Sequence, residues 1–444
     1  MKIIIFLQKL SARPKGTLIP EQARLPVAFQ SEAGKELSFF PYFNCVESRL
    51  HYSKAKQNVE KFHSSSKNSQ LSTLNSQLFL LPLHSKIGWR VQNMPFHSPL
   101  CPLNPEEMDK KDLRIVFMGT PEFAVETLRA LVEGGYNVVA VVTQPDKPVG
   151  RHGSVLRAPA VKEYALSVGL PVLQPEKMKD PAFVEELRFY KADLQVVVAF
   201  RMLPEIVWAM PRFGTFNVHA ALLPQYRGAA PINWAIINGE TTTGVTTFFL
   251  DHDIDTGRII LQKKYDIPDE ADVEYVYDGL MHLGAEIAIE TIDLIISRNG
   301  LVTSTSQEEF LTNELQVSSS KFQLKPAPKL FKETCRINWN QSAKNVYDFV
   351  RGLSPIPTAW TTLVPNADAT VSAAPVDVKI FKTQKAGRMC SATPGMLLVE
   401  KSRLFVATTD EWLEVLDLQL AGKKRMPARD FLNGFKSISS FHME

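Results

Sequence analysis

Cysteine is scarce in this 444-residue chain, and no long apolar run is present. The four cysteines form neither a CxxC pair nor a Cys/His spacing typical of a metal site: Cys45, Cys101, Cys335 and Cys390. So few cysteines in a chain of this length favour a reducing compartment. No apolar stretch is long enough to span a bilayer, and the apolar run after Met1 ends at Gln8, too soon for a signal-peptide core. We therefore expect a cytoplasmic protein without a membrane segment.

A strong charge of one sign and the glycine motifs of nucleotide-binding proteins are also lacking. The formal net charge of +3 permits a nucleic-acid partner if the basic residues cluster, but does not require one. Neither GxGxxG nor GxxxxGKS/T occurs, so nicotinamide-dinucleotide and P-loop proteins are disfavoured. The remaining composition, 45% hydrophobic and 22% charged, is that of an ordinary globular protein with two or three domains.

Residues 1–107 differ in texture from the rest of the chain. They are rich in Ser, Asn, Gln and Lys, and the sequence NSQL occurs at residues 68–71 and again at 75–78. Such a segment cannot easily bury enough apolar surface to offset its ordering entropy. We expect a disordered extension, and we expect a chain that begins at Met108 to keep full activity, because a clean strand follows at once.

An alternation of strands and helices begins at Leu113. Residues 113–119 form an apolar strand, Thr120 is suited to cap a helix over 122–133 with Pro121 at its first position, and a strand over 137–143 follows. Strand, helix and strand at this spacing predict a parallel sheet. Further elements extend the pattern: strands at 193–200 and 214–219, a hairpin of 244–250 with 258–264, and a long helix at 273–297. We expect residues 108–300 to form a Rossmann-like, doubly wound, mostly parallel α/β domain.

The last part of the chain predicts a different architecture. Residues 301–320 are polar with little pattern and are expected to be a linker. Short β-prone runs then alternate with Pro and Gly, and one helix is expected at 343–353. Residues 321–444 therefore predict a small, OB-like β-barrel domain.

Asn217 and His219 are the first candidates for chemistry. They are two residues apart in a strand, so their side chains point to the same side. His219 is expected at the carboxyl end of that strand, where open α/β sheets bind ligands. A lone histidine is more often a hydrogen-bonded core residue, but Asn217 is a second polar group that needs a partner. Together they predict a catalytic centre for acyl transfer.

Asp255 is the third candidate, from the sequence DHDIDTG at residues 251–257. A calcium loop would need glycine at its sixth position and a glutamate at its twelfth, but this chain has Gly257 at the seventh and Gln262 at the twelfth. Two alternatives remain, a solvated turn or a hairpin tip that carries Asp255 to His219.

These segments, in their order, resemble the formyltransferases that use 10-formyltetrahydrofolate. The matching sequences are FMGTPEFA at 117–124, TQPDKPVGR at 143–151, NxH at 217–219, LLPQYRGAAPI at 222–232, DTG at 255–257 and AGKKRM at 421–426. Within that family, the resemblance is greatest to members that formylate methionyl-initiator tRNA. It covers residues 113–435, and residues 1–107 have no counterpart.

The resemblance implies a role for each candidate. His219 would be the general base toward the attacking amine, since imidazole suits proton transfer near neutral pH. Asn217 would donate a hydrogen bond to the oxygen of the tetrahedral intermediate, and Asp255 would orient His219. No metal and no covalent intermediate are implied. The folate would be bound by Ala221, Leu222, Leu223 and Pro224, with Ala221 standing where the family commonly has Ser.

The resemblance also implies a tRNA partner. A basic loop that enters the acceptor stem would contain Lys147, Arg151 and Arg157, and a second basic cluster comprises Lys423, Lys424 and Arg425. Judged by charge alone, the loop and the second cluster would both be interpreted as solvated basic surface. Two other functions stay open: the same chemistry on a small acceptor such as an amino-sugar nucleotide or glycinamide ribonucleotide, and a catalytically silent RNA-binding protein. Nothing in the pattern requires an oligomer, so we expect a monomer.

Overall fold

A computed structural model describes residues 3–4, 28–29, 108–149, 155–317, 323–367 and 374–444. The chain divides into two units, Met1–Pro99 and Leu100–Glu444. In the first unit the described residues are two antiparallel strands, β1 (Ile3–Ile4) and β2 (Ala28–Phe29). The expectation of a disordered extension over residues 1–107 otherwise lies outside the described residues.

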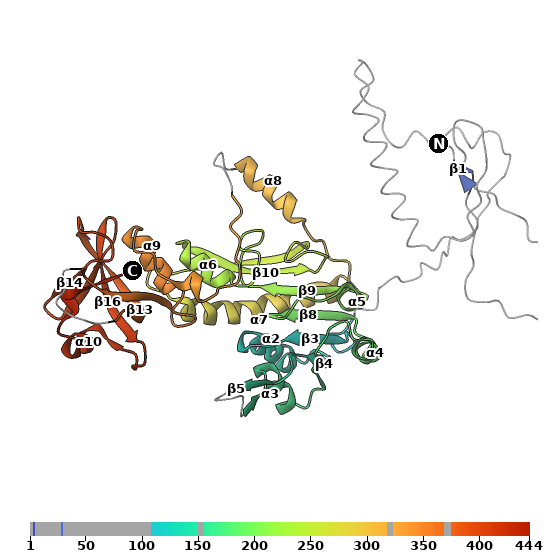
Figure 1. Ribbon diagram of the computed structural model, residues 1–444. Helices are drawn as coiled ribbons and strands as arrows, with labels where there is room; N and C mark the ends of the chain where they lie inside the picture. The colour runs from blue at the N-terminus through green and yellow to red at the C-terminus, as the bar shows by residue number, and fades with distance from the viewer. Residues whose placement is uncertain (1–2, 5–27, 30–107, 150–154, 318–322, 368–373) are drawn as a thin grey trace, which may run out of the picture. The chain divides into compact units, whose positions relative to one another are not determined.

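A seven-stranded, mostly parallel sheet organises the first part of the second unit (Figure 1). Its strand order is β11-β10-β9-β8-β3-β4-β7, and only β10 runs antiparallel to its neighbours β9 and β11. This confirms the predicted doubly wound α/β architecture. The strands are β3 (Ile115–Gly119), β4 (Val138–Val142), β7 (Val172–Leu173), β8 (Leu194–Val198), β9 (Thr215–His219), β10 (Thr242–Phe249) and β11 (Ile259–Asp266).

Helices cover both faces of this sheet. Strand β3 is buried on both sides: Ile115 and Phe117 belong to the core that contains residues of α2 and α7, whereas Val116 and Met118 pack in the core that contains residues of α4. Burial on both faces explains why the strand reads as a continuous apolar run. The helices are α2 (Glu122–Glu133), α3 (Ala160–Ser167), α4 (Pro181–Phe189), α5 (Glu205–Trp208), α6 (Pro231–Ile237) and α7 (Val273–Ser297).

The start of α2 differs from the sequence prediction. Pro121 is the N-cap residue, with an extended ψ of 175°, so the helix begins one residue later than the proposed cap at Thr120 implies. The Thr120 hydroxyl makes no capping bond; it is buried without a hydrogen-bond partner among the described residues. The prediction that Thr120 caps this helix was therefore wrong.

The stretch predicted as a linker contains a helix, α8 (Gln307–Val317). The Ser306 hydroxyl accepts a hydrogen bond from the Glu309 amide at 3.2 Å. Ser followed three residues later by Glu is a sequence signature of a helix N-terminus. The sequence did not predict this helix because its apolar periodicity is weak, although the capping signal was present.

A nearly closed antiparallel barrel forms the C-terminal part, as predicted. The sheet order is β14-β15-β16-β13-β12-β18, and a bridge between Met396 and His442 joins the regions of its two end strands. Its strands are β12 (Ala359–Pro365), β13 (Val376–Met389), β14 (Leu397–Glu400), β15 (Arg403–Ala407), β16 (Glu411–Leu420), β17 (Met426–Pro427) and β18 (Phe441–Met443). Its helices are η3 (Glu333–Cys335), α9 (Ala343–Arg351), α10 (Ala428–Gly434) and η4 (Ile438–Ser440). No helix in the described ranges could cross a membrane.

Candidate active site

Strand β9 delivers Asn217 and His219 to the carboxyl edge of the sheet. It lies between β8 and β10, so neighbouring strands hold its backbone on both sides. Asn217 is half-buried, and His219 is 5% exposed. Both line a cavity of about 640 Å³, which opens beside the strand ends as expected for a sheet of this kind.

This cavity is lined by both apolar and polar residues. Its lining includes residues after β8, after β9 and in the connection from β10 to β11. Cavities of this size that combine apolar walls with a few polar groups are typical small-molecule sites. The apolar walls include Phe200, Leu203, Trp208, Leu250 and Ile254, and the polar groups include Asn217, His219, Asp251, Asp253 and Asp255.

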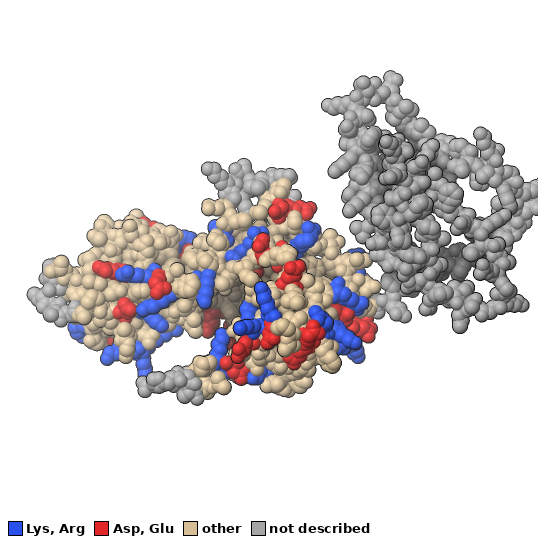
Figure 2. Space-filling view, turned by 45° about the vertical axis from the view of Figure 1, so that its right-hand side comes forward, with Lys and Arg blue, Asp and Glu red and all other residues tan. Residues whose placement is uncertain are grey.

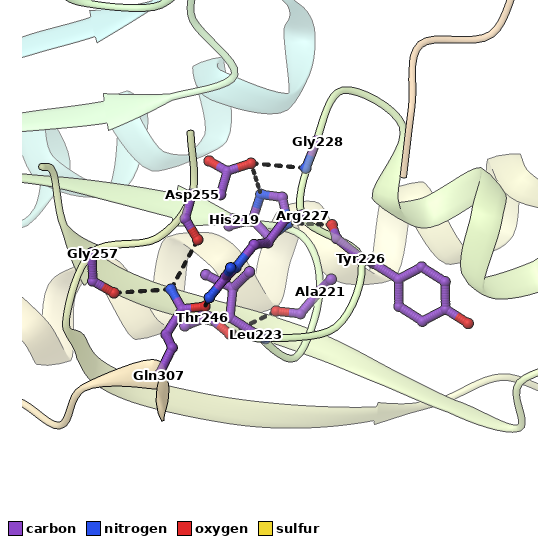
Figure 3. A network of polar contacts seen from close by, with 10 residues as sticks. All are labelled: His219, Ala221, Leu223, Tyr226, Arg227, Gly228, Thr246, Asp255, Gly257 and Gln307. Carbon is purple, nitrogen blue, oxygen red and sulfur yellow. Dashed lines mark hydrogen bonds and ion pairs between the residues drawn. The ribbon is translucent and has the colours of Figure 1, made fainter. Parts of the chain in front are cut away.

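The two ring nitrogens of His219 have different partners. Nε2 lies 2.9 Å from the carbonyl oxygen of Tyr226 (Figure 3). Since a carbonyl only accepts, Nε2 carries a proton and donates it, and the lone pair of the neutral ring is on Nδ1. Nδ1 lies 3.8 Å from Asp255 Oδ2. The nitrogen that holds the free lone pair is therefore the one that lies near the carboxylate.

Asp255 reaches this position from the connection between β10 and β11. Its φ of +55° lies in the left-handed region that residues other than glycine seldom adopt. Its Oδ2 accepts a hydrogen bond from the Gly228 amide at 2.9 Å. The structure thus brings Asn217, His219 and Asp255 to one cavity, and Asp255 lies at a hairpin tip rather than in a solvated turn.

Residues 325–327, which we call the strap, hold the Tyr226–Gly228 loop through backbone contacts. The sequence did not predict them. The Tyr226 amide donates to the carbonyl of Lys325 at 2.7 Å, and the Ala327 amide donates to the carbonyl of Arg227 at 2.8 Å. Gly228 and Ala327 also form a parallel bridge. These contacts use backbone atoms, so the residue types of the strap carried no signal.

Gln307 is a second residue that the sequence did not single out. Its amide contacts the backbone of Asp255 and the side chain of Arg227 (Figure 3). It comes from α8, in the segment predicted as a linker.

The predicted folate segment has a different placement from the catalytic residues. Ala221, Leu223 and Pro224 are buried, Leu222 is half-buried, and none of the four lines the cavity. The Thr246 hydroxyl donates to the Ala221 carbonyl at 2.6 Å and accepts from the Leu223 amide at 3.1 Å. The backbone of this segment is thus already bonded within the protein.

Two tyrosines near the site, the half-buried Tyr277 and the buried Tyr226, have raised pKa values. Burial raises the pKa of Tyr277, which lines the cavity and accepts a hydrogen bond from the Phe123 amide. Burial, together with the hydrogen bond to Glu240, raises the pKa of Tyr226. The raised pKa values keep both hydroxyls neutral at physiological pH.

The basic residues assigned to tRNA lie on exposed elements. Lys147 and Arg157 face each other across a strand pair, β5 (Lys147–Val149) and β6 (Val155–Arg157). Arg151 lies outside the described residues. On the barrel, Lys423 and Lys424 are exposed, whereas Arg425 pairs with Asp417 at 2.6 Å. The face in Figure 2 carries both signs of charge rather than a continuous basic surface.

No group of three or more potential metal ligands occurs among the residues that the structure describes. The cavity lining likewise contains no serine or cysteine among those residues. Asn217, His219 and Asp255 supply the cavity with an amide, an imidazole and a carboxylate.

Comparison with known proteins identifies the family. Residues 113–292 match the Formyl transferase model, and residues 329–436 match the model Formyl transferase, C-terminal domain. The methionyl-tRNA formyltransferase of Parabacteroides distasonis is 59% identical over 335 residues, which cover 75% of this chain and 99% of the relative. That of Bacteroides fragilis is 56% identical over 339 residues, 76% of this chain and 99% of the relative.

One solved structure is a more distant match. HypX from Aquifex aeolicus in complex with tetrahydrofolic acid aligns with 73% of this chain and 47% of its own, at 19% identity and a TM-score of 0.47. That likeness is too low to support an argument about the ligand. The two matched domain models and the identity over nearly the whole length of the relatives are sufficient without it: the chain belongs to the methionyl-tRNA formyltransferase family.

Proposed function

We propose that this protein transfers the formyl group of 10-formyltetrahydrofolate to the α-amino group of methionyl-initiator tRNA, in the cytoplasm, for translation initiation. The observation that carries the proposal is the convergence of Asn217, His219 and Asp255 on one cavity at the edge of the sheet. The names of the relatives supply the acceptor.

His219 acts as the general base through Nδ1. Its Nε2–H is engaged by the Tyr226 carbonyl, so Nδ1 is the nitrogen with a lone pair. As the amine nitrogen attacks the formyl carbon, its proton passes to Nδ1. The bond from that carbon to N10 of the folate then breaks, and N10 leaves with the proton that the imidazolium returns, so that His219 ends the reaction neutral. A general base of this kind contributes about 10²- to 10⁴-fold.

Asn217 stabilises the tetrahedral intermediate. Its side chain forms no hydrogen bond with another side chain or backbone group within the described ranges, and it faces the same cavity as His219. An amide N–H aimed at the developing oxyanion is worth roughly 3 kcal/mol.

Asp255 stabilises the imidazolium that forms on His219. The separation of 3.8 Å between Oδ2 and Nδ1 exceeds a direct hydrogen bond, so the carboxylate acts by charge or through one water. Its bond from the Gly228 amide keeps it at that distance. Direct transfer from folate to amine needs no enzyme nucleophile and no metal.

The folate contacts the apolar wall of the cavity. Phe200, Leu203 and Trp208 offer apolar surface for the pterin ring, and polar lining residues such as Asp251 lie in the same cavity. Residues 221–224 then support the cavity without lining it, because hydrogen bonds to the Thr246 hydroxyl hold their backbone in place. In this arrangement, the missing Ser hydroxyl at Ala221 costs the cofactor no contact.

The tRNA contacts Lys147 and Arg157, which are exposed on β5 and β6, Arg151 from the sequence between these strands, and Lys423, Lys424 and Arg425 on the barrel. Phosphate contacts make such binding dependent on salt, and RNA is recognised mainly by shape and unpaired ends. Arg425 contributes less than its neighbours because Asp417 already neutralises it.

One assay tests the proposal. Purified protein is incubated with 10-formyltetrahydrofolate and either methionyl-initiator tRNA or an amino-sugar nucleotide. We expect formylation of the methionyl group. Transfer only to the sugar would identify a small-acceptor enzyme, and transfer to neither would favour a catalytically silent RNA-binding protein.

A further inference from the structure

Gln307 is a buried polar residue to which the mechanism assigns no role. It begins α8, and only 2% of its surface is exposed. A buried amide is seldom left without partners. Because Gln307 does not line the cavity, any influence on the reaction must pass through the residues that it contacts.

All four hydrogen-bonding positions of the Gln307 amide are occupied (Figure 3). Nε2 donates to the carbonyl oxygen of Asp255 at 2.8 Å and to that of Gly257 at 2.9 Å. Oε1 accepts from Arg227 Nε at 2.9 Å and from Arg227 Nη2 at 2.5 Å. Carbonyls only accept and a guanidinium only donates, so these neighbours fix which end of the amide faces which partner.

The two donated bonds hold the hairpin tip. The acceptors are the carbonyls of Asp255 and Gly257, the residues on either side of Thr256, and the backbone of Asp255 is left-handed. A backbone conformation of this kind persists only where the surroundings enforce it. The carboxylate that this backbone carries is the one that lies 3.8 Å from His219 Nδ1.

The accepted bonds hold the opposite side of the site. Arg227 stands between Tyr226, whose carbonyl accepts from His219 Nε2, and Gly228, whose amide donates to Asp255. Gln307 therefore connects the two backbone segments between which the imidazole of His219 lies.

We propose that Gln307 is a positioning residue: it ties the Asp255 hairpin to the Arg227 loop and so sets the Asp255 carboxylate against Nδ1 of His219. This inference rests on the proposed function, because it acts through the base of that reaction. It gives the first residue of α8 a role in positioning the catalytic groups.

Two variants separate the two halves of the amide. Gln307→Met removes every hydrogen bond at similar length, whereas Gln307→Glu keeps an acceptor for Arg227 and loses both donors to the hairpin. We expect both variants to lower kcat by about tenfold to a hundredfold, with little change in the KM of either substrate. Losses of this size follow when a residue that supports a catalytic group is removed, or when that group moves by about 1 Å. Wild-type kcat in Gln307→Glu, which keeps an acceptor for Arg227 but has no donor for the hairpin, would overturn the proposal.

Gln195→Ala is the matched control. Gln195 is also a fully buried amide of this domain, and its Oε1 accepts from the Thr215 hydroxyl at 2.9 Å, but it touches neither His219 nor Asp255. We expect this variant to lower Tm while leaving kcat near the wild-type value.

A double-mutant cycle with Asp255→Ala tests the route of the effect. If Gln307 acts through Asp255, Gln307→Met should cost little further activity in that background. Losses that multiply would show that Gln307 acts elsewhere and would overturn the proposal. The cycle is run with both acceptors, so wild-type protein that is active only on the amino-sugar nucleotide contradicts the proposed acceptor and still allows Gln307 to be judged.

Discussion

The imidazole of His219 donates from Nε2 to the backbone carbonyl of Tyr226, 2.9 Å away. This contact fixes the ring orientation and places the lone pair on Nδ1, toward Asp255. Tyr226 has a φ of +59°, in the left-handed region that residues other than glycine seldom adopt. A backbone atom, rather than a side chain, thus sets the tautomer of the proposed base.

Removal of that base should separate turnover from binding. We expect His219→Ala to lower kcat about 10²- to 10⁴-fold, whereas the Kd for the folate changes far less, because the ring handles a proton rather than holding the pterin. Steady-state kinetics and fluorescence titration with folate measure the two quantities. His282→Ala is the control, since His282 is exposed and pairs with Glu126 outside the cavity. A near-normal rate in His219→Ala would refute the general-base role.

The Asn217 amide should matter only in the transition state. We expect Asn217→Ala to lower kcat by about a hundredfold, the usual loss for one oxyanion donor, with a small change in KM. Asn217→Asp has the same shape but cannot donate, so it should lose as much. If Asn217→Asp kept wild-type activity, hydrogen-bond donation would not be the function of this side chain.

Because Gly228 has no Cβ, the backbone of the strap can pass close to the Tyr226–Gly228 loop. A Cβ at this position would lie 2.4 Å from the Ala327 carbonyl oxygen, and its φ is +126°. We expect Gly228→Ala to destabilise the protein by about 1–3 kcal/mol and to lower kcat, because the Gly228 amide also holds Asp255. Thermal unfolding and kinetics are the measurements.

Gly169→Ala is the control for Gly228→Ala, because it introduces backbone strain without a steric collision. Gly169 has a similar positive φ of +75°, but a Cβ there would have no neighbour within 4 Å. We expect it to lose stability without losing activity. Equal kinetic losses in the two variants would mean that the strap does not support the site.

The parts of the site that the sequence predicted act through their side chains. Asn217, His219 and Asp255 are polar residues in places where the chain is otherwise apolar or turns tightly, and that contrast is visible in a sequence. Tyr226 and Ala327 act through backbone atoms, so no residue type indicates them. Gln307 is polar, but its neighbours in sequence are polar as well, and only the tertiary contacts distinguish it.

Acid should weaken the barrel through Asp410. The Ala343 amide at the start of α9 donates to its carboxylate at 2.7 Å and, with Thr408, lowers the pKa of Asp410 below its ordinary value of 3.8. A lowered pKa in the folded state stabilises above the unfolded value, and the stabilisation is lost as pH falls through the folded pKa. We expect Asp410→Ala to cost about 1 kcal/mol at pH 7, as a lost cap does.

The comparison of Tm at two pH values tests that sign. The difference in Tm between wild type and Asp410→Ala should shrink as pH falls from 7 through the ordinary pKa of 3.8 and toward the lowered pKa of the folded state. A difference that grows on acidification would show that another group dominates.

The β5–β6 hairpin carries a charge arrangement that folding alone does not favour. Lys147 and Arg157 are directly opposite each other, and like charges at such a pair are destabilising. We therefore expect Lys147→Gln to leave Tm unchanged or slightly higher, to raise the KM for methionyl-tRNA, and to leave the KM for the folate unchanged. If a phosphate contact is lost, the slope of log affinity against log salt should flatten by about one. Lys147→Arg keeps the charge and should behave as wild type. An unaltered tRNA KM and salt slope in Lys147→Gln would remove this hairpin from the proposed RNA interface.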